Sequence, residues 1–145
     1  MSLRNILKGT GVAVVTPFAK NGAVDYDALG KLLDYIIGNN VEYIVTLGTT
    51  GETPVLTTKE KIDIIQATYA HVNSRVPVIV GIGGNNTHEV VEQLAILPLK
   101  DATAILSASP YYNKPSQEGI FQHYRAIAEK SPKPVLLYNV PSRTG

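Results

Sequence analysis

Cysteine is absent from the 145-residue sequence, and charged residues make up only 17% of it. Without cysteine, the chain has no disulfide framework and no thiolate-ligated metal site. The absence of disulfides is also compatible with a reducing cytoplasm, which is the location we expect. The net charge is only +1, so the chain lacks the basic surface that binding to nucleic acid or to an acidic membrane requires.

Long apolar runs are absent as well. No segment approaches the ~20 residues of a membrane-spanning helix, and residues 1–8 lack the apolar core of a signal peptide. The three histidines, His71, His88 and His123, lie in segments expected to be helical and do not have metal-ligand spacing. We therefore expect exposed helix residues at these positions and no metal site. Hydrophobic residues make up 44%, as in a soluble globular domain with a substantial core.

What the sequence does contain is an alternation of two kinds of segment. Apolar runs typical of buried parallel strands cover residues 11–18, 43–47, 77–81, 102–108 and 134–138. Segments with helical spacing of apolar residues follow four residues that favour helix N-termini, namely Asp25, Thr57, Asn86 and Ser116. Glu60 lies three residues after Thr57, which is a capping-box pattern. These units of about 30 residues have the size of βαβ repeats and predict a parallel sheet covered by helices.

Two architectures are built from such repeats, the doubly wound open sheet and the (β/α)8 barrel. The glycine fingerprint of a dinucleotide-binding fold does not follow the first strand, and Gly81-Ile82-Gly83-Gly84 matches it only in part. We therefore expect a TIM (β/α)8 barrel, of which this chain covers about the first four and a half βα units. A complete barrel needs about 250 residues. Residues 1–145 are thus predicted to be the N-terminal part of a single catalytic barrel domain, with open edges at the first and fifth strands.

Active sites of (β/α)8 barrels lie at the carboxyl ends of the strands. In this sequence those ends carry hydroxyls, amides, one carboxylate and one guanidinium, whereas the opposite ends carry ordinary turns. The polar segments are Thr16-Pro17, Gly48 to Glu52, Gly83 to Asn86, Ser109 to Asn113 and Tyr138 to Arg143. This asymmetry predicts a site at the carboxyl edge of the sheet.

The segment Gly48-Thr49-Thr50-Gly51 is the most distinctive of these strand ends. Its glycines permit a positive φ or a close approach to a ligand, and its hydroxyls and N–H groups suit a small anion such as a carboxylate. No nucleophile elbow is present. The remaining chemistry is proton transfer by the hydroxyls of Thr49, Tyr112 and Tyr138. Arg143 is the candidate cation, both to lower the cost of tyrosine ionisation and to hold a carboxylate.

Three segments of the sequence resemble the dihydrodipicolinate synthase (4-hydroxy-tetrahydrodipicolinate synthase) family. They are Gly48 to Glu52, Tyr111 to Gly119 and Tyr138 to Gly145. The likeness runs from about Gly9 to the last residue, in order and with the spacing of the family. Any one of the motifs alone is not specific, but the three together are.

The resemblance implies a class I aldolase-type lyase of lysine and diaminopimelate biosynthesis, built on a (β/α)8 barrel and needing no cofactor. In this family pyruvate forms a Schiff base with a lysine, and the derived enamine attacks L-aspartate 4-semialdehyde to give 4-hydroxy-tetrahydrodipicolinate. The resemblance also implies a homo-oligomer, commonly a dimer of dimers. Neither a nucleic acid nor a membrane partner is implied.

The resemblance assigns a role to each matching residue. Tyr138 is the proton donor and acceptor beside the Schiff base, Thr49 is a relay hydroxyl, and Tyr112 is the relay member that reaches into the site of a neighbouring subunit. Thr50, with its backbone N–H, holds the pyruvate carboxylate. Arg143 clamps the carboxylate of the semialdehyde.

Two features of this sequence depart from the family pattern. The Schiff-base lysine of the family follows the sixth strand, and none of the lysines present occupies that position, so we expect the chain alone to be inactive. Asn85, Glu89 and Tyr111 match the interface site at which lysine inhibits many bacterial members. Lys61 stands where inhibited enzymes often carry histidine, which leaves lysine feedback open.

Three other interpretations stay open from the sequence. N-acetylneuraminate lyase and 2-keto-3-deoxy sugar-acid aldolases share the barrel, the glycine-threonine turn and the tyrosine, but Arg143 within Pro-Ser-Arg-Thr-Gly favours a dicarboxylate product. A non-catalytic half-barrel that acts as an assembly module is a second alternative. A small-anion-binding domain that uses only the Thr49-Thr50 turn is the third.

Overall fold

The computed structural model describes residues 2–144, which form a five-stranded sheet with every neighbouring pair parallel. The strands are β1 (Gly11–Ala13), β2 (Tyr43–Thr46), β3 (Val78–Gly81), β4 (Ala104–Ala108) and β5 (Val135–Tyr138). The α-helices are α1 (Leu3–Ile6), α2 (Tyr26–Gly38), α3 (Thr58–Val72), α4 (Thr87–Ile96), α5 (Gln117–Lys130) and α6 (Pro141–Thr144), and two 3₁₀ turns, η1 (Thr49–Gly51) and η2 (Thr53–Val55), follow β2. Within residues 2–144, no helix is both long and apolar enough to span a bilayer.

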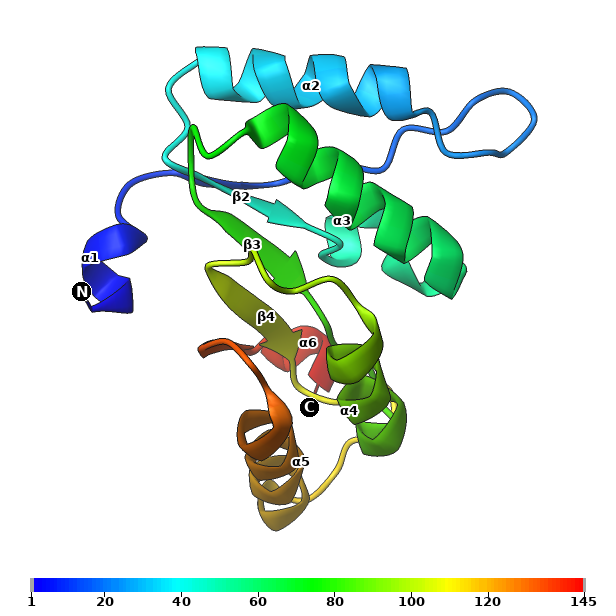
Figure 1. Cartoon of the computed structure of the whole chain (residues 1–145). Helices are drawn as coiled ribbons and strands as arrows, with labels where there is room; N and C mark the ends of the chain where they lie inside the picture. Colours follow the sequence, from blue (N-terminus) through cyan, green and yellow to red (C-terminus); the bar gives the residue numbers. More distant parts are fainter. Residues whose placement is uncertain (1, 145) are drawn as a thin grey trace.

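Strand order distinguishes the two candidate architectures. The order in the sheet is β1-β2-β3-β4-β5, the same as the order in the sequence, and it never reverses. A doubly wound sheet would reverse at a switch point, and its helices would then cover both faces. Here α2 to α5 lie along one side of a curved sheet, and α1 lies on the other side (Figure 1). The prediction of barrel topology is therefore confirmed, with β1 and β5 as the two edge strands.

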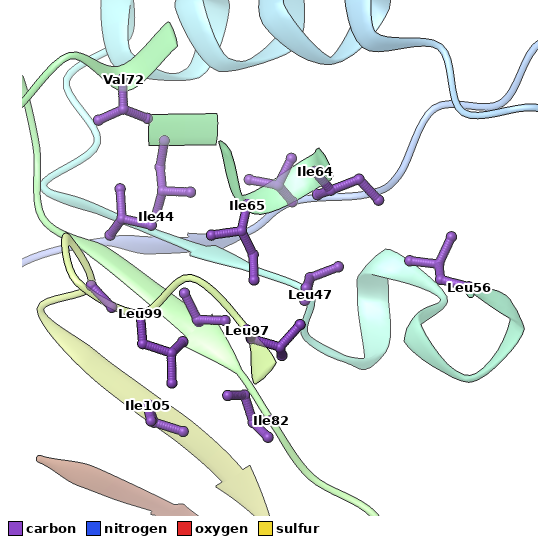
Figure 2. Packing of buried hydrophobic residues seen from close by; sticks show 14 of the residues in the cluster. Ile44, Leu47, Leu56, Ile64, Ile65, Val72, Ile82, Leu97, Leu99 and Ile105 are labelled. Atoms are coloured by element: carbon purple, nitrogen blue, oxygen red, sulfur yellow. The ribbon is translucent and has the colours of Figure 1, made fainter. Parts of the chain in front are cut away.

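The core consists of two apolar layers of unequal size. The larger layer lies between the sheet and helices α2 to α5 and includes Ile44, Ile65 and Ile105, all fully buried (Figure 2). The smaller layer lies on the opposite face, where Val45 and Ile79 contact residues of α1 and its vicinity. Because adjacent residues of a strand point to opposite faces, Ile44 and Val45 belong to different layers. Both faces of the sheet are thus apolar, as the continuous hydrophobic strands of the sequence predict.

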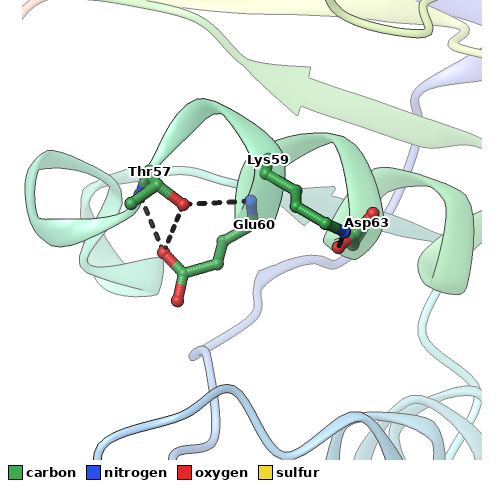
Figure 3. Close-up of polar contacts among 4 residues, drawn as sticks. All are labelled: Thr57, Lys59, Glu60 and Asp63. Carbon is green, nitrogen blue, oxygen red and sulfur yellow. Dashed lines mark hydrogen bonds and ion pairs between the residues drawn. The ribbon is translucent and has the colours of Figure 1, made fainter.

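Side chains predicted to cap the helices do so. Asp25 Oδ1 accepts from the N–H of Ala28 at 2.9 Å, and Ser116 Oγ accepts from the N–H of Gly119 at 3.1 Å. At the start of α3, Thr57 and Glu60 form the predicted capping box, in which the Thr57 N–H donates to Glu60 Oε2 at 2.8 Å (Figure 3). The hydrogen bonds that Glu60 accepts from the N–H and the hydroxyl of Thr57 lower the pKa of its carboxyl.

Replacement of Thr57 by alanine should lower the free energy of unfolding by about 1 kcal/mol, because the N–H of Glu60 loses its acceptor in the first turn of α3. Urea unfolding followed by circular dichroism measures this change. Thr58→Ala is the matched control, since Thr58 is an exposed residue just inside the helix. Equal effects of the two substitutions would show that the cap is not what stabilises α3.

Several expected boundaries differ from the structure. The first strand covers three residues rather than 11–18, because β1 pairs only with β2 and the chain turns away after the N–H of Val14 donates to Val45 O. Residues 17–25 instead form a turn in which Phe18 pairs with Val24 in an antiparallel bridge. The short helix α6 and the two 3₁₀ turns were not expected at all.

The expectation that all three histidines are exposed is wrong for one of them. His71 and His88 are exposed as predicted, but His123 is only 3% exposed. It lies on α5 against α4, with Nδ1 2.8 Å from the Thr87 hydroxyl, while Nε2 is buried without a partner among the described residues. A polar position on the buried face of an amphipathic helix cannot be recognised without knowing which neighbour it meets.

Burial lowers the pKa of His123 below its ordinary value. A histidine that is harder to protonate in the folded state than in the unfolded state favours unfolding as the pH falls below about 6.5. We therefore expect the free energy of unfolding to fall in that range, and His123→Gln to reduce the slope. Urea unfolding between pH 7.5 and pH 5.0 measures it, with exposed His71→Gln as the control. An unchanged slope in His123→Gln would contradict the assignment.

Candidate active site

The segments that follow β2, β3, β4 and β5 leave the sheet at one edge, because parallel strands share their carboxyl end. Thr49 and Thr50 lie in η1 directly after β2, Tyr112 lies in the loop after β4, and Tyr138 is the last residue of β5. Arg143 lies on α6, which follows β5. The structure therefore brings all five predicted site residues to this edge.

The turn that contains Thr49 and Thr50 is held by hydrogen bonds from neighbouring segments. The Thr53 hydroxyl lies 2.7 Å from Leu47 O and 2.9 Å from Gly48 O, and the Thr16 hydroxyl donates to Gly51 O at 2.7 Å. The hydroxyls of Thr49 and Thr50 are in exposed residues and have no hydrogen-bond partner within residues 2–144. A firmly held turn with two available hydroxyls suits a ligand.

The glycines of this turn have a different role from the one expected. Gly48 has a φ of −69°, and positive φ angles occur instead at Leu47 and Glu52, both at 55°. Space is tight at Gly51, where a Cβ would lie 3.2 Å from Val14 O and would require a small shift of that carbonyl. Gly81 of β3 is needed for space, since a Cβ there would overlap the carbonyl group of Leu47. Close packing of backbone segments, rather than glycine flexibility, fixes the turn.

The loop between β4 and α5 presents two tyrosines to solvent. Tyr112 is 88% exposed and Tyr111 is also exposed. The φ of Tyr112 is 70° and that of Lys114 is 46°, a left-handed conformation that costs about 1 kcal/mol or more for a residue with a side chain. Because nearly all of its surface is exposed, the side chain of Tyr112 projects away from the rest of this chain.

Tyr138 and Arg143 occupy the end of β5 and the helix after it. Tyr138 is 45% exposed, and Arg143 is exposed. Helix α6 is held to the two-residue link after β5 through Thr144, whose hydroxyl lies 2.9 Å from Asn139 Oδ1 and 3.0 Å from Val140 O. Within residues 2–144 no hydrogen bond joins the hydroxyls of Thr49, Tyr112 and Tyr138 to one another. The three residues predicted to form a relay thus lie at one edge of the sheet, and the relay itself stays a prediction.

The residues matched to a lysine-binding site lie close to this edge. Asn85 and Glu89 are exposed at the start of α4, and Glu89 Oε1 accepts from the Asn86 side-chain amide at 2.9 Å. Tyr111 lies in the loop after β4. Lys133, in contrast, lies before β5, where its ammonium donates to Lys100 O at 2.7 Å. It is at the amino edge of the sheet and cannot serve the candidate site.

A curved parallel sheet in sequential order, with its polar groups at the carboxyl edge, defines one half of a (β/α)8-barrel protein. The chain belongs to the dihydrodipicolinate synthetase family, which matches residues 6–145. The resemblance seen in the three motifs is therefore confirmed.

Relatives of known sequence and structure agree with this assignment. The chain is 55% identical over 139 residues to the 4-hydroxy-tetrahydrodipicolinate synthase of Parabacteroides distasonis, covering 96% of this chain and 47% of the relative. It is 45% identical, with a TM-score of 0.89, to the crystal structure of the chloride-inhibited synthase from Acinetobacter baumannii complexed with pyruvate, covering 94% of this chain and 47% of that one. A synthase from Cyanidioschyzon merolae with lysine bound is 38% identical, with a TM-score of 0.86 and coverage of 94% and 47%.

The coverage values define the extent of the match. The chain spans about half the length of the curated relatives that it matches, and it corresponds to their N-terminal portion. The solved relatives are TIM barrels, and the five strands of this chain account for about half of such a barrel.

Proposed function

We propose that residues 1–145 supply the N-terminal half of the active site of a 4-hydroxy-tetrahydrodipicolinate synthase, a lyase of lysine and diaminopimelate biosynthesis. The observation that carries the proposal is the convergence of Thr49, Thr50, Tyr112, Tyr138 and Arg143 on one sheet edge in a member of this family. The substrates would be pyruvate and L-aspartate 4-semialdehyde. The pyruvate bound in the Acinetobacter baumannii relative supports the first of them.

The proposed chemistry needs a lysine at the end of a sixth strand, and the five strands within residues 2–144 do not include that strand. The lysine amine and the pyruvate carbonyl lose water to form an imine, and removal of a proton from the pyruvate methyl group gives the enamine that attacks the aldehyde. Tyr138, with Thr49, would move these protons. Tyr112 would complete the relay from a neighbouring subunit, in line with its projection away from this chain.

The carboxylates of the two substrates would be held by different residues. The N–H and hydroxyl of Thr50, on the fixed turn after β2, suit the pyruvate carboxylate. Arg143 suits the carboxylate of the semialdehyde, because a guanidinium can donate two parallel hydrogen bonds to it. This division distinguishes the proposal from a sugar-acid aldolase, whose second substrate is bound through hydroxyls.

The surface beside β5 supports the need for further βα units. Leu137 and Phe121 are exposed, and they line an apolar groove of about 590 Å³ along α5 and β5. In a closed barrel the next strand and helix would cover such a surface. Residues 1–145 would therefore be part of a single barrel domain, and without the lysine they would not form the pyruvate imine.

The test is a hybrid chain in which residues 1–145 are joined to the C-terminal half of the Parabacteroides distasonis synthase. Incubation with pyruvate and borohydride, followed by mass spectrometry, should trap a pyruvyl adduct on the hybrid and none on residues 1–145 alone. A coupled assay should detect turnover with aspartate semialdehyde only in the hybrid. An adduct on residues 1–145 alone would overturn the division of the site, and a folded hybrid without turnover would overturn the proposed reaction.

Size-exclusion chromatography of residues 1–145 addresses the assembly-module alternative. A stable oligomer of this chain, together with an inactive hybrid, would favour that alternative. The homo-oligomer expected from the family should instead form with the hybrid, which contains a complete barrel. Calorimetry with pyruvate on residues 1–145 tests the simple anion-binding alternative, which requires measurable heat.

Asn85, Glu89 and Tyr111 are proposed as part of a regulatory lysine site. Support comes from their exposure near the carboxyl edge and from the Cyanidioschyzon merolae relative, which was solved with lysine bound. A carboxylate at Glu89 and an amide at Asn85 suit the ammonium groups of lysine. Inhibition of the hybrid by lysine, lost in Glu89→Gln, would support the assignment, and inhibition unaltered by Glu89→Gln would contradict it.

A further inference from the structure

The hydroxyl of Tyr124 makes contacts that tie α5 to the end of β4. It lies 3.1 Å from Ser107 O and 3.0 Å from Ser109 Oγ. Tyr124 is on the face of α5 that packs against the sheet, and Ser109 is 4% exposed. Ser107 lies in β4, and Ser109 is the first residue after β4, at the start of the loop that carries Tyr111 and Tyr112.

The direction of each hydrogen bond follows from the number of protons available. A backbone carbonyl can only accept, so the single proton of Tyr124 is donated to Ser107 O. Ser109 must then be the donor to the Tyr124 oxygen. Burial raises the pKa of Tyr124, so the hydroxyl keeps the proton that this arrangement requires.

Ser109 connects this contact to the end of β5. Its N–H donates to Tyr138 O at 3.1 Å, which extends the ladder between β4 and β5 by one bond beyond the pair Ala108 and Tyr138. Tyr124 of α5 thus holds the side chain of Ser109, and Tyr138, the residue proposed to transfer protons, holds its backbone N–H. Any shift of Ser109 would be transmitted to the backbone of Tyr138.

The other end of the same loop is also attached to α5. Ser116 caps the helix through the bond from the N–H of Gly119, and Ser109 is fixed through Tyr124 at the loop's beginning. Between these anchors, Tyr112 and Lys114 adopt left-handed backbone conformations. Such conformations persist only where the surrounding structure holds them, so both anchors contribute to the placement of Tyr112.

We propose that Tyr124 is a positioning residue for the reaction, which fixes the backbone of Tyr138 and the loop of Tyr112 relative to each other through Ser109. The proposal rests on the proposed function for its effect on turnover. Its structural part concerns residues 1–145 alone and can be tested separately.

The structural test is amide hydrogen exchange of residues 1–145 carrying Tyr124→Phe, which removes only the hydroxyl. The N–H of Ser109 should exchange about five- to tenfold faster, since the substitution removes the hydrogen bonds of Tyr124 to Ser107 O and to the Ser109 side chain. Tyr69→Phe is the matched control, because the Tyr69 hydroxyl is buried without a partner among the described residues. Exchange at Ser109 that is the same in Tyr124→Phe and Tyr69→Phe would overturn the positioning role.

The functional test uses the hybrid chain. Tyr124→Phe should lower kcat by about five- to tenfold and leave KM for pyruvate within about twofold, because proton transfer depends on alignment more than binding does. Ser109→Ala should have a similar effect, and the double variant should not be additive. If the unmodified hybrid has no turnover, the proposed reaction fails, and exchange at Ser109 still decides the positioning role. Equal kcat values for Tyr124→Phe and Tyr69→Phe would limit Tyr124 to a structural contact and overturn the proposal.

Discussion

Replacement of Tyr138 by phenylalanine in the hybrid chain should lower kcat by about 10²–10⁴-fold, the usual contribution of a positioned general acid or base. The side chain lies at the end of β5, 45% exposed, on the edge where Thr49 and Arg143 are also found. Phenylalanine keeps the ring and removes only the hydroxyl that would carry the proton. Steady-state kinetics with both substrates measures the change.

The binding of pyruvate should survive this substitution, because its carboxylate is assigned to Thr50 rather than to Tyr138. KM for pyruvate is expected to stay within about threefold, as for a group that acts mainly in the transition state. Tyr35→Phe is a suitable control, since Tyr35 is an exposed residue of α2. A kcat reduced by less than about fivefold would remove Tyr138 from the proposed proton relay.

The order of elements was predictable because each signal is local. A run such as Val78 to Gly81 is apolar at every position, which is typical of a parallel strand buried on both faces. Cap residues such as Thr57 specify helix starts through hydrogen bonds within one turn, so sequence alone is sufficient. The length of β1 was not predictable in the same way, because it depends on pairing with β2.

Features of the site that depend on contacts between distant segments could not be predicted from the sequence. Leu47 and Glu52 carry the positive φ angles of the turn after β2, and neither residue type signals that conformation. The contact of Tyr124 with Ser109 joins a helix to a strand end, and a tyrosine on an amphipathic helix gives no sign of its hydroxyl partner. Sequence therefore indicated which residues gather at the edge, but not what holds them there.

The substitution Gly81→Ala should combine a loss of stability with a loss of activity. A Cβ at Gly81 would overlap the backbone carbonyl group of Leu47 and crowd the N–H of Gly48, and neither can rotate away as a side chain could. Leu47 is buried and already left-handed, so its backbone has little freedom to adjust. We expect the free energy of unfolding to fall by about 3 kcal/mol, at the upper end of the cost of overpacking.

The same overlap would displace the start of the turn that carries Thr49 and Thr50. In the hybrid chain a shift of about 1 Å there should reduce kcat/KM for pyruvate by about 10²-fold, even where the protein is still folded. Urea unfolding and kinetics on the folded fraction measure the two effects separately. Gly48→Ala is the matched control, because a Cβ at Gly48 would meet only Val45 Cγ1, at 3.7 Å, and its φ of −69° suits alanine. If Gly81→Ala and Gly48→Ala were equally stable and equally active, close backbone packing could not be what fixes this turn.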